Sequence, residues 1–430
     1  MTQDGTAAHS GWLSMARRLE EMDGLGRTGL IEPGADNPPV SFWVPGELLT
    51  DNPTAVIAIL AKRGVVARTD PNACAGVYRI IVDADTDACG PLLAADISRI
   101  LGDEGFVGLN HVLTLAPVPK IGPGTDPEPT KPVPWGCKPI ALPKDWRIAV
   151  VDTGLFKGAP SHLASSSANE WELVDYDGGG IVDFSGTGHG GFIAGIFHRM
   201  LGVAPIVRDV ATRDYYDWTF AITEADIIAD VERLLQDERV KVINLSLGTY
   251  EQSTNLAALR SKVRHWVRWR SDVLLVCAAG NDSTETPFYP AAFGAEPGLA
   301  DHVVSVGALD CPPDVPDAGA GKADFSNHGD WVTAWAPGVD HTSDYPHDVE
   351  FVYGPDQDDP GAPRAAFAGL ARWSGTSFAA PFAAAELVRY AVANHISPRE
   401  AWSSLRDACP TFPLDGGPCH TPAAEGHIAM

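Results

Sequence analysis

Four apolar runs mark the second half of the chain. They lie at residues 146–152, 240–247, 272–280 and 301–309. Largely continuous apolar runs are typical of parallel strands that are buried on both faces. Apolar residues recur at helical spacing over 221–236 and 256–269, between these runs. Strands that alternate with helices predict a doubly wound, mainly parallel α/β sheet.

Shorter elements of both kinds fill the first half. Strand-like, β-branched stretches lie at residues 40–44, 65–69, 76–84 and 105–115. Helical patterns cover 52–64 and 90–104, and the first begins with Asn52 as a cap and Pro53 at its first helical position. The order β-α-β-β-α-β is typical of a smaller, ferredoxin-like α+β domain.

A proline-rich segment, residues 116–144, separates the two halves. Proline fixes φ and removes a backbone donor, so this segment is predicted to be an extended linker. A long ordered loop of one domain is the alternative. The predicted organisation is a helical extension (1–30), the ferredoxin-like domain (31–115), the linker (116–144), the α/β domain (145–408) and a tail (409–430).

Charge and cysteine content limit the classes of function and the cellular locations that fit this sequence. The chain has 31 basic and 56 acidic side chains and a formal charge of −25, which argues against nucleic-acid binding. The first 24 residues lack a secretory pattern, and no run of about 18 apolar residues could span a membrane. Seven scattered cysteines therefore suggest free thiols in a cytoplasmic protein. Cys409, Cys419 and His420 lack the paired spacing of a zinc site, so no metal is expected there.

Asp152, Thr153 and Gly154 follow the first apolar run of the second half, and two classes of protease present a catalytic aspartate in this way. An aspartic protease needs a second carboxylate that shares a proton with the first. No second Asp-Thr/Ser-Gly copy follows an apolar strand, because residues 182–186 have the wrong order. The aspartic class would also require an all-β fold. A serine protease, in contrast, needs a histidine and a serine elsewhere.

Both residues are present at helix starts. His189 lies 37 residues after Asp152, in GTGHGGFIAGIF, and Ser377 lies in RWSGTSFAAPFAAAE. The amide groups at a helix N-terminus favour negative charge, so the N–H of Ser377 could stabilise a developing oxyanion. Pro381 is expected in the first turn of that helix, where proline is tolerated.

These motifs give the second half a family resemblance. Residues 144–408 resemble the subtilases, the subtilisin-like serine peptidases, and the order Asp152, His189, Ser377 is that of the subtilisin triad. Further segments match in order: INLSLG (243–248), AAGN (278–281), FYPAAF (288–293), VVSVGAL (303–309), DFSNHG (324–329) and AWAPGVD (334–340).

The resemblance implies a serine endopeptidase and assigns its roles. Ser377 would attack the scissile carbonyl, His189 would take and return the proton, and Asp152 would orient His189. Asn281 corresponds to the side-chain oxyanion donor. The substrate-binding edge, on which a peptide would lie as an added strand, corresponds to Ser246, Leu247 and Gly248. The expected partner is a peptide or protein substrate, and no cofactor is expected.

Two departures from the family pattern concern the segment after His189. The family usually continues with Gly-Thr-His, whereas this chain has Gly190, Gly191 and Phe192. Gly191 inside a helix costs up to about 1 kcal/mol against alanine. The connection from Phe197 to the segment GVAP is short, so the calcium-binding loop of many subtilases is not predicted here. Cys277, within an apolar strand, is interpreted as core packing.

Alternatives remain for each half. Sedolisins share the serine motif but use a Glu-Asp pair and an aspartate oxyanion donor, and His189 and Asn281 argue against them. A peptide-binding scaffold on a subtilase fold is an alternative of a different class. Subtilase propeptides commonly have a ferredoxin-like fold and inhibit the protease, so the N-terminal domain is a candidate inhibitor of its own chain. A permanent accessory domain is the rival interpretation.

Overall fold

The computed structural model describes residues 29–31, 41–70, 74, 76–83, 90–115, 127–132, 137–156, 159–164, 173–174, 181–182, 188–210, 222–251, 256–313, 320–352 and 364–408. The predicted N-terminal helix and the C-terminal tail, with Cys409, Cys419 and His420, lie outside these residues. The chain forms two compact units. Unit 1 comprises Met1–Thr114, Thr212–Arg233 and Thr249–Trp269, and unit 2 comprises Leu115–Ala211, Leu234–Gly248 and Arg270–Met430.

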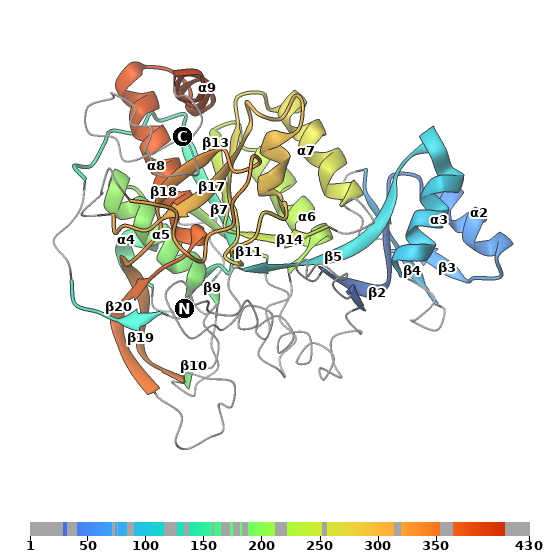
Figure 1. Cartoon of the computed structure of the whole chain (residues 1–430), viewed down its shortest axis with the longest axis horizontal. Helices are drawn as coiled ribbons and strands as arrows, with labels where there is room; N and C mark the ends of the chain where they lie inside the picture. The colour runs from blue at the N-terminus through green and yellow to red at the C-terminus, as the bar shows by residue number, and fades with distance from the viewer. Residues whose placement is uncertain are drawn as a thin grey trace. The chain divides into compact units, whose positions relative to one another are not determined.

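A six-stranded parallel sheet forms the centre of unit 2 (Figure 1). In spatial order its strands are β11 (Ile206–Asp209), β7 (Arg147–Asp152), β13 (Val240–Leu245), β15 (Leu274–Ala278), β17 (Val303–Leu309) and β18 (Ala334–Pro337). The four predicted runs form β7, β13, β15 and β17, so the predicted doubly wound sheet is confirmed. The second run is shorter than predicted, because β13 ends before Ser246 and β14 (Leu247–Tyr250) follows.

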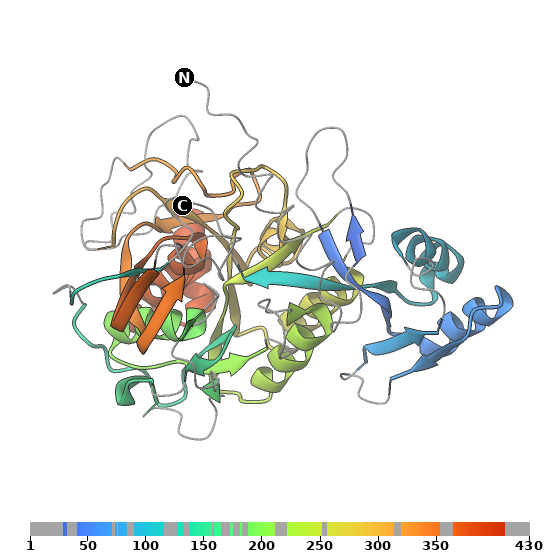
Figure 2. The same cartoon turned by 90° about the horizontal axis from the view of Figure 1, so that it is seen from below.

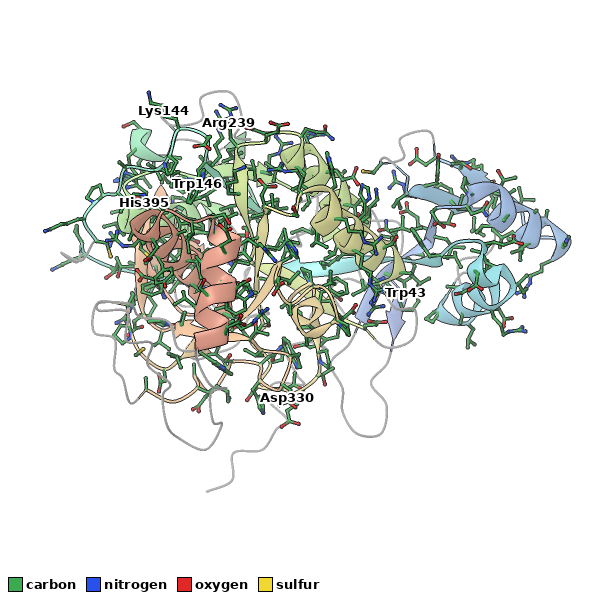
Figure 3. All side chains as sticks on the ribbon, turned by 90° about the horizontal axis from the view of Figure 1, so that it is seen from above. Trp43, Lys144, Trp146, Arg239, Asp330 and His395 are labelled. Carbon is green, nitrogen blue, oxygen red and sulfur yellow. The ribbon has the colours of Figure 1, made fainter. Side chains whose placement is uncertain are left out.

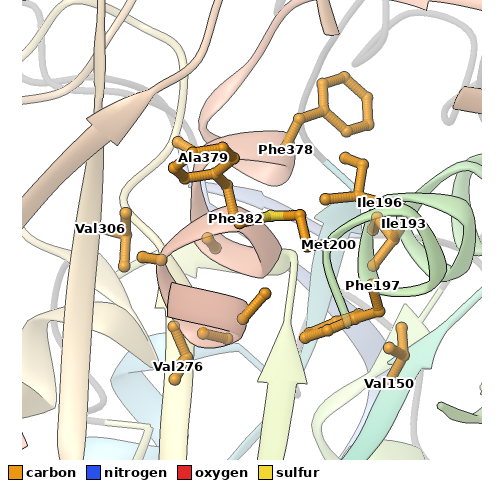
Figure 4. Close-up of a cluster of buried hydrophobic side chains, with 14 of the residues drawn as sticks. Val150, Ile193, Ile196, Phe197, Met200, Val276, Val306, Phe378, Ala379 and Phe382 are labelled. Atoms are coloured by element: carbon orange, nitrogen blue, oxygen red, sulfur yellow. The ribbon is translucent and has the colours of Figure 1, made fainter. Parts of the chain in front are cut away.

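Two buried helices pack against this sheet and against each other, α5 (His189–Leu201) and α8 (Thr376–Asn394). Figure 4 shows Ile193, Phe197 and Met200 of α5 gathered with Phe382 of α8 in this core. Ala379, Ala380, Ala383 and Ala384 of α8 are fully buried. Because these side chains are small, the helix axis can approach the strands closely, and the start of α8 is held firmly against the sheet.

A long hairpin of β19 (His341–Val352) and β20 (Arg364–Trp373) leads into α8, and β19 packs beside α5 (Figure 2). Its outer strands are β10 (Ile181–Val182) on β19 and β6 (Glu128–Pro129) on β20. The remaining short elements of unit 2 are β8 (Leu155–Phe156), β9 (Leu173–Val174), α4 (Ser161–Ala164), β16 (Phe288–Tyr289), η3 (Ala291–Ala295) and α9 (Pro398–Ala408).

The described parts of the predicted linker are bound to unit 2. Besides the pairing of β6, Ile140 N donates to Leu201 O at 3.0 Å, and Arg389 donates to Lys138 O at 2.9 Å. Strand β7 of the unit 2 sheet follows this segment, and Arg147 N at its start donates to Arg239 O. Figure 3 labels Lys144, Trp146 and Arg239 around this point of the chain. Extended backbone with few donors of its own can be fixed in this way by donors from the fold.

The N-terminal part of unit 1 contains the predicted elements in the predicted order. They are β2 (Ser41–Thr50), α2 (Pro53–Lys62), β3 (Ala67–Thr69), β4 (Tyr78–Val82), α3 (Pro91–Leu101) and β5 (Val107–Leu115), with β1 (Gly29–Ile31) on β2 and η2 (Gly102–Glu104) after α3. Four of these strands lie side by side in the order β5-β2-β4-β3. Asn52 Oδ1 caps α2 by accepting from Ala55 N, as the sequence predicts. Trp43, labelled in Figure 3, is buried in the core under both helices.

Unit 1 also contains two segments from later in the chain. They include β12 (Ile222–Thr223), most of α6 (Glu224–Leu235) and all of α7 (Ala257–Trp269). β12 pairs antiparallel with β5, and Ile222 lies opposite Leu113. The N-terminal elements and these later helices thus form one compact body. Among the described residues, no helix is long and apolar enough to cross a membrane.

Candidate active site

Asp152 and His189 form a buried pair where strand β7 of the unit 2 sheet ends. Asp152 is the last residue of β7, and His189 is the first residue of α5. His189 Nδ1 lies 2.8 Å from Asp152 Oδ1 and 3.0 Å from Oδ2. Both side chains are fully buried. This geometry fixes the ring orientation and leaves Nε2 as the nitrogen available for proton transfer.

Thr153 connects the two elements that carry this pair. Its N–H donates to Asp152 Oδ1 at 2.8 Å, and its hydroxyl accepts from Gly190 N at 3.0 Å. Gly190 allows the approach, because a Cβ atom there would lie 2.6 Å from Gly154 O. Thr153 was not predicted to have a role, although its place between Asp152 and Gly154 was a signal for one.

Ser377 is the second residue of α8 and lies against Ser246. Its Oγ donates to Ser246 O at 3.4 Å, and Ser246 Oγ donates to Ser377 O at 2.8 Å. The expectation for Pro381 was wrong: it is the sixth residue of α8 and lies beyond the first turn. Proline at this position has no N–H for the carbonyl four residues earlier, which is that of Ser377. Ser246 Oγ supplies the missing donor.

Asn281 is oriented by Thr376, the neighbour of Ser377. Asn281 Oδ1 accepts from Thr376 N and from Thr376 Oγ1, both at 2.9 Å. The Thr376 hydroxyl in turn accepts from Gly280 N at 3.0 Å. With Oδ1 held on this side, Nδ2 is directed toward Gly375, where a Cβ atom would lie 3.5 Å from it. An amide fixed in this way is a preorganised donor beside Ser377.

Aromatic rings surround His189 and account for Phe192. The His189 ring lies edge-on to Trp373, with centroids 5.5 Å apart, and 5.4 Å from Phe378. Phe192 packs on both rings, at 5.6 Å from Trp373 and 4.6 Å from Phe378. Phe192 is therefore core packing behind the imidazole. Trp373 and Phe378 lie within the Ser377 motif, but no sequence pattern assigned them a role.

The described conformation is closed. Ser377 is 1% exposed, and His189 Nε2 makes no hydrogen bond to any described residue. The predicted substrate edge begins at Ser246 and continues into β14 with Leu247 and Gly248, all of them buried. In this conformation Ser377 Oγ is hydrogen-bonded to Ser246 O rather than to His189 Nε2.

No set of three metal-ligating side chains occurs among the described residues. The connection from α5 to β11 consists of Gly202, Val203, Ala204 and Pro205, which carry no side-chain oxygen. The absence of a cofactor stays a prediction. Cys277 is buried in β15, as predicted for core packing, and burial raises the pKa of its thiol.

Comparison with known proteins points to one family. A model described as the subtilase family matches residues 144–408. Over 209 residues the chain is 32% identical to a thermophilic serine proteinase of Bacillus sp. (strain AK1), covering 46% of this chain and 44% of that protein. Over 232 residues it is 28% identical to thermitase of Thermoactinomyces vulgaris. This match covers 49% of this chain and 72% of thermitase.

Among solved structures, the chain is similar in fold to fervidolysin from Fervidobacterium pennivorans, a keratinolytic enzyme related to subtilisin. The TM-score is 0.55 at 18% identity, and the match covers 87% of this chain and 60% of that one. The structural match to fervidolysin thus covers a larger share of this chain than the family model, which matches residues 144–408.

Proposed function

This chain belongs to the subtilase family, and on that premise we propose that it is a serine endopeptidase acting through Asp152, His189 and Ser377. The observation that carries the proposal is the buried Asp152–His189 pair, with Nδ1 2.8 Å from the carboxylate. Such a pair stabilises the imidazolium that forms when Nε2 accepts a proton.

The chemistry follows from these positions. Ser377 Oγ attacks the scissile carbonyl carbon while its proton passes to His189 Nε2. The oxyanion receives hydrogen bonds from Asn281 Nδ2 and from the N–H of Ser377 at the start of α8. His189 then returns the proton to the leaving amine, and an acyl-enzyme remains on Ser377. Water then attacks the acyl-enzyme with the same help from His189, and the acyl part of the peptide leaves Ser377 as a carboxylic acid.

Labelling by a fluorophosphonate tests the proposal directly. We expect the probe to label Ser377 and to inhibit hydrolysis of a peptide library. Ser377→Ala should abolish both signals and keep the fold, since a hydroxyl is replaced by hydrogen at a buried position. Activity above a tenth of wild type in Ser377→Ala would refute the assignment. Absence of labelling after removal of the N-terminal domain would favour a peptide-binding scaffold.

We further propose that the N-terminal domain restrains the peptidase. Support comes from unit 1, in which this domain is grouped with the described parts of segments 212–233 and 249–269, both inside the subtilase match. Asn110 Oδ1 accepts from Ala225 N at the start of α6, and His111 Nδ1 lies 3.0 Å from the buried carboxylate of Glu224. The domain is therefore fixed to elements of the peptidase sequence.

The cellular setting is also a proposal. The scattered cysteines favour a cytoplasmic protein, and fractionation of the source cells would test this location. The natural substrate is open, and profiling with a peptide library would define its sequence.

A further inference from the structure

We propose that Phe288 restricts the substrate residue on the acyl side of the scissile bond to a small side chain, such as glycine, alanine or serine. The inference rests on the proposed peptidase function and adds a substrate class to it. Phe288 belongs to β16 and is 1% exposed. Nothing in the catalytic steps requires it.

The position of the acyl residue follows from the groups that must contact it. Its carbonyl carbon must meet Ser377 Oγ, and its carbonyl oxygen must meet Asn281 Nδ2. Its own backbone lies beside the segment from Ser246 to Gly248, on which the peptide forms an added strand. The side chain must therefore extend between the backbone at Gly248 and the backbone at Gly280, next to Asn281.

The ring of Phe288 occupies this space. A Cβ atom on Gly248 would collide with Phe288 Cε1 and would lie 2.7 Å from Cζ. A Cβ atom on Gly280 would lie 3.2 Å from Phe288 Cδ1 and Cγ. One ring thus lies against the backbone at both Gly248 and Gly280, where a side chain on either residue would collide with it or crowd it.

A large substrate side chain would have to displace this ring. Burying a phenylalanine ring stabilises a fold and overpacking a filled core destabilises it, so displacing this ring is unfavourable. A methyl or hydroxymethyl group needs far less room than a second ring. Selectivity here comes from exclusion of large side chains rather than from attraction of small ones.

The test uses the full chain and two fluorogenic peptides that differ only in alanine or phenylalanine before the scissile bond. The ratio of their kcat/KM values does not depend on how much of the enzyme is active. We expect wild type to favour alanine by about tenfold or more, since one methylene changes such ratios about 10–200-fold. Phe288→Ala should shift the ratio toward phenylalanine by about a hundredfold.

Two variants control for loss of stability. Phe293→Ala removes another fully buried ring, whose centroid lies 4.9 Å from that of the Tyr289 ring. This change should leave the ratio of the two kcat/KM values unchanged. If Phe288→Ala does not fold, Phe288→Leu should shift the ratio in the same direction and by less.

The outcomes separate the two proposals. A wild type that favours phenylalanine, or a Phe288→Ala ratio equal to wild type, overturns the role of Phe288 and leaves the peptidase intact. No hydrolysis of either peptide and no fluorophosphonate labelling of Ser377, both before and after cleavage of the chain between Pro117 and Ala141, would overturn the peptidase function and this inference with it.

Discussion

Ser246 Oγ donates a hydrogen bond to the carbonyl oxygen of Ser377 at 2.8 Å, where Pro381 leaves that carbonyl without its helical donor. Asn244 Nδ2 donates to the same hydroxyl at 2.9 Å and holds it in place. The backbone of the predicted nucleophile is thus anchored to the start of the substrate edge by one buried hydroxyl.

Ser246→Ala should lower the free energy of unfolding by about 1–3 kcal/mol, because the buried Ser377 carbonyl loses the hydrogen bond from Ser246 Oγ. Chemical denaturation measures this loss. The double variant Ser246→Ala, Pro381→Ala should recover part of it, since alanine at position 381 restores a backbone N–H four residues after Ser377. If Pro381→Ala adds to the destabilisation and recovers nothing, this account of the hydrogen bond is wrong.

Sequence patterns predicted most of the architecture, because buried parallel strands have a distinctive composition. The runs that became β7 and β17 were located almost to the residue, and Asn52 identified the start of α2. The predicted substrate edge was harder: residues 240–247 were predicted to form one strand, but the strand is interrupted at Ser246. Ser246 there contacts Ser377, 131 residues away, and no local pattern encodes this contact.

Asp152, His189 and Ser377 could be proposed as a triad from the sequence because each lies in a motif with Gly, Thr or Ser neighbours. Residues that act on them through space were missed. Trp373 and Phe378 contact the His189 ring only after β20 and α8 are packed beside α5, so their role depends on tertiary structure. Pro381 was misplaced although the helix start was predicted to within one residue, because the sixth residue of a helix that begins at Thr376 lies beyond its first turn. Phe288 was part of a matched segment, but its ring position depends on Gly248 and Gly280.

Gly191 gives a second prediction, in which two effects oppose each other. Alanine in a helix interior is favoured over glycine by up to about 1 kcal/mol. At this position a Cβ atom would lie 2.6 Å from Phe156 Cε1 and 2.8 Å from Cδ1, and such overpacking costs about 1–3 kcal/mol. Gly191→Ala should therefore lower the melting temperature. In a Phe156→Leu background the same change should be less harmful. An increase in stability in the wild-type background would contradict the observed packing.

His341 predicts a pH dependence of stability. It is fully buried, and this burial lowers its pKa to about 4, although Nε2 bonds the Pro337 carbonyl at 2.8 Å. The unfolded chain, with an ordinary pKa near 6.5, binds the proton first as the pH falls. The contribution of neutral His341 to the free energy of unfolding is therefore fully present above about pH 6.5, and it is lost as the pH falls from there toward 4. From pH 7 to 5 the loss is about 2 kcal/mol.

The measurement compares denaturation of wild type and His341→Gln at pH 7 and pH 5. The comparison is needed because burial raises the pKa of Glu386 to about 7, which changes stability in the opposite direction over this range. The variant should lose less stability than wild type on acidification. Equal losses in the two proteins would show that His341 is not the responsible group.

The last prediction concerns restraint by the N-terminal domain. Glu224 is fully buried in unit 1, where Oε1 accepts from Leu259 N at 2.7 Å, near the start of α7, and Oε2 lies 3.0 Å from His111 Nδ1. One carboxylate thus joins β5 to two helices of the peptidase sequence. His111→Ala would leave a buried carboxylate oxygen without this partner, at a cost of about 1–3 kcal/mol. That cost corresponds to a weakening of docking by up to about a hundredfold.

If docking restrains the peptidase, full-length wild type should hydrolyse peptides slowly, and cleavage between Pro117 and Ala141 should raise the rate. The His111→Ala chain should be faster than wild type before cleavage and equal to it afterwards, because the change lies outside the matched peptidase region. Arg99→Ala is the matched control, since the Arg99 side chain is 74% exposed on α3 and pairs only with Asp96 among the described residues. It should leave the full-length rate unchanged. Equal rates for the intact and cleaved wild-type chains would instead make the N-terminal domain an accessory module, docked on the peptidase without restraining it.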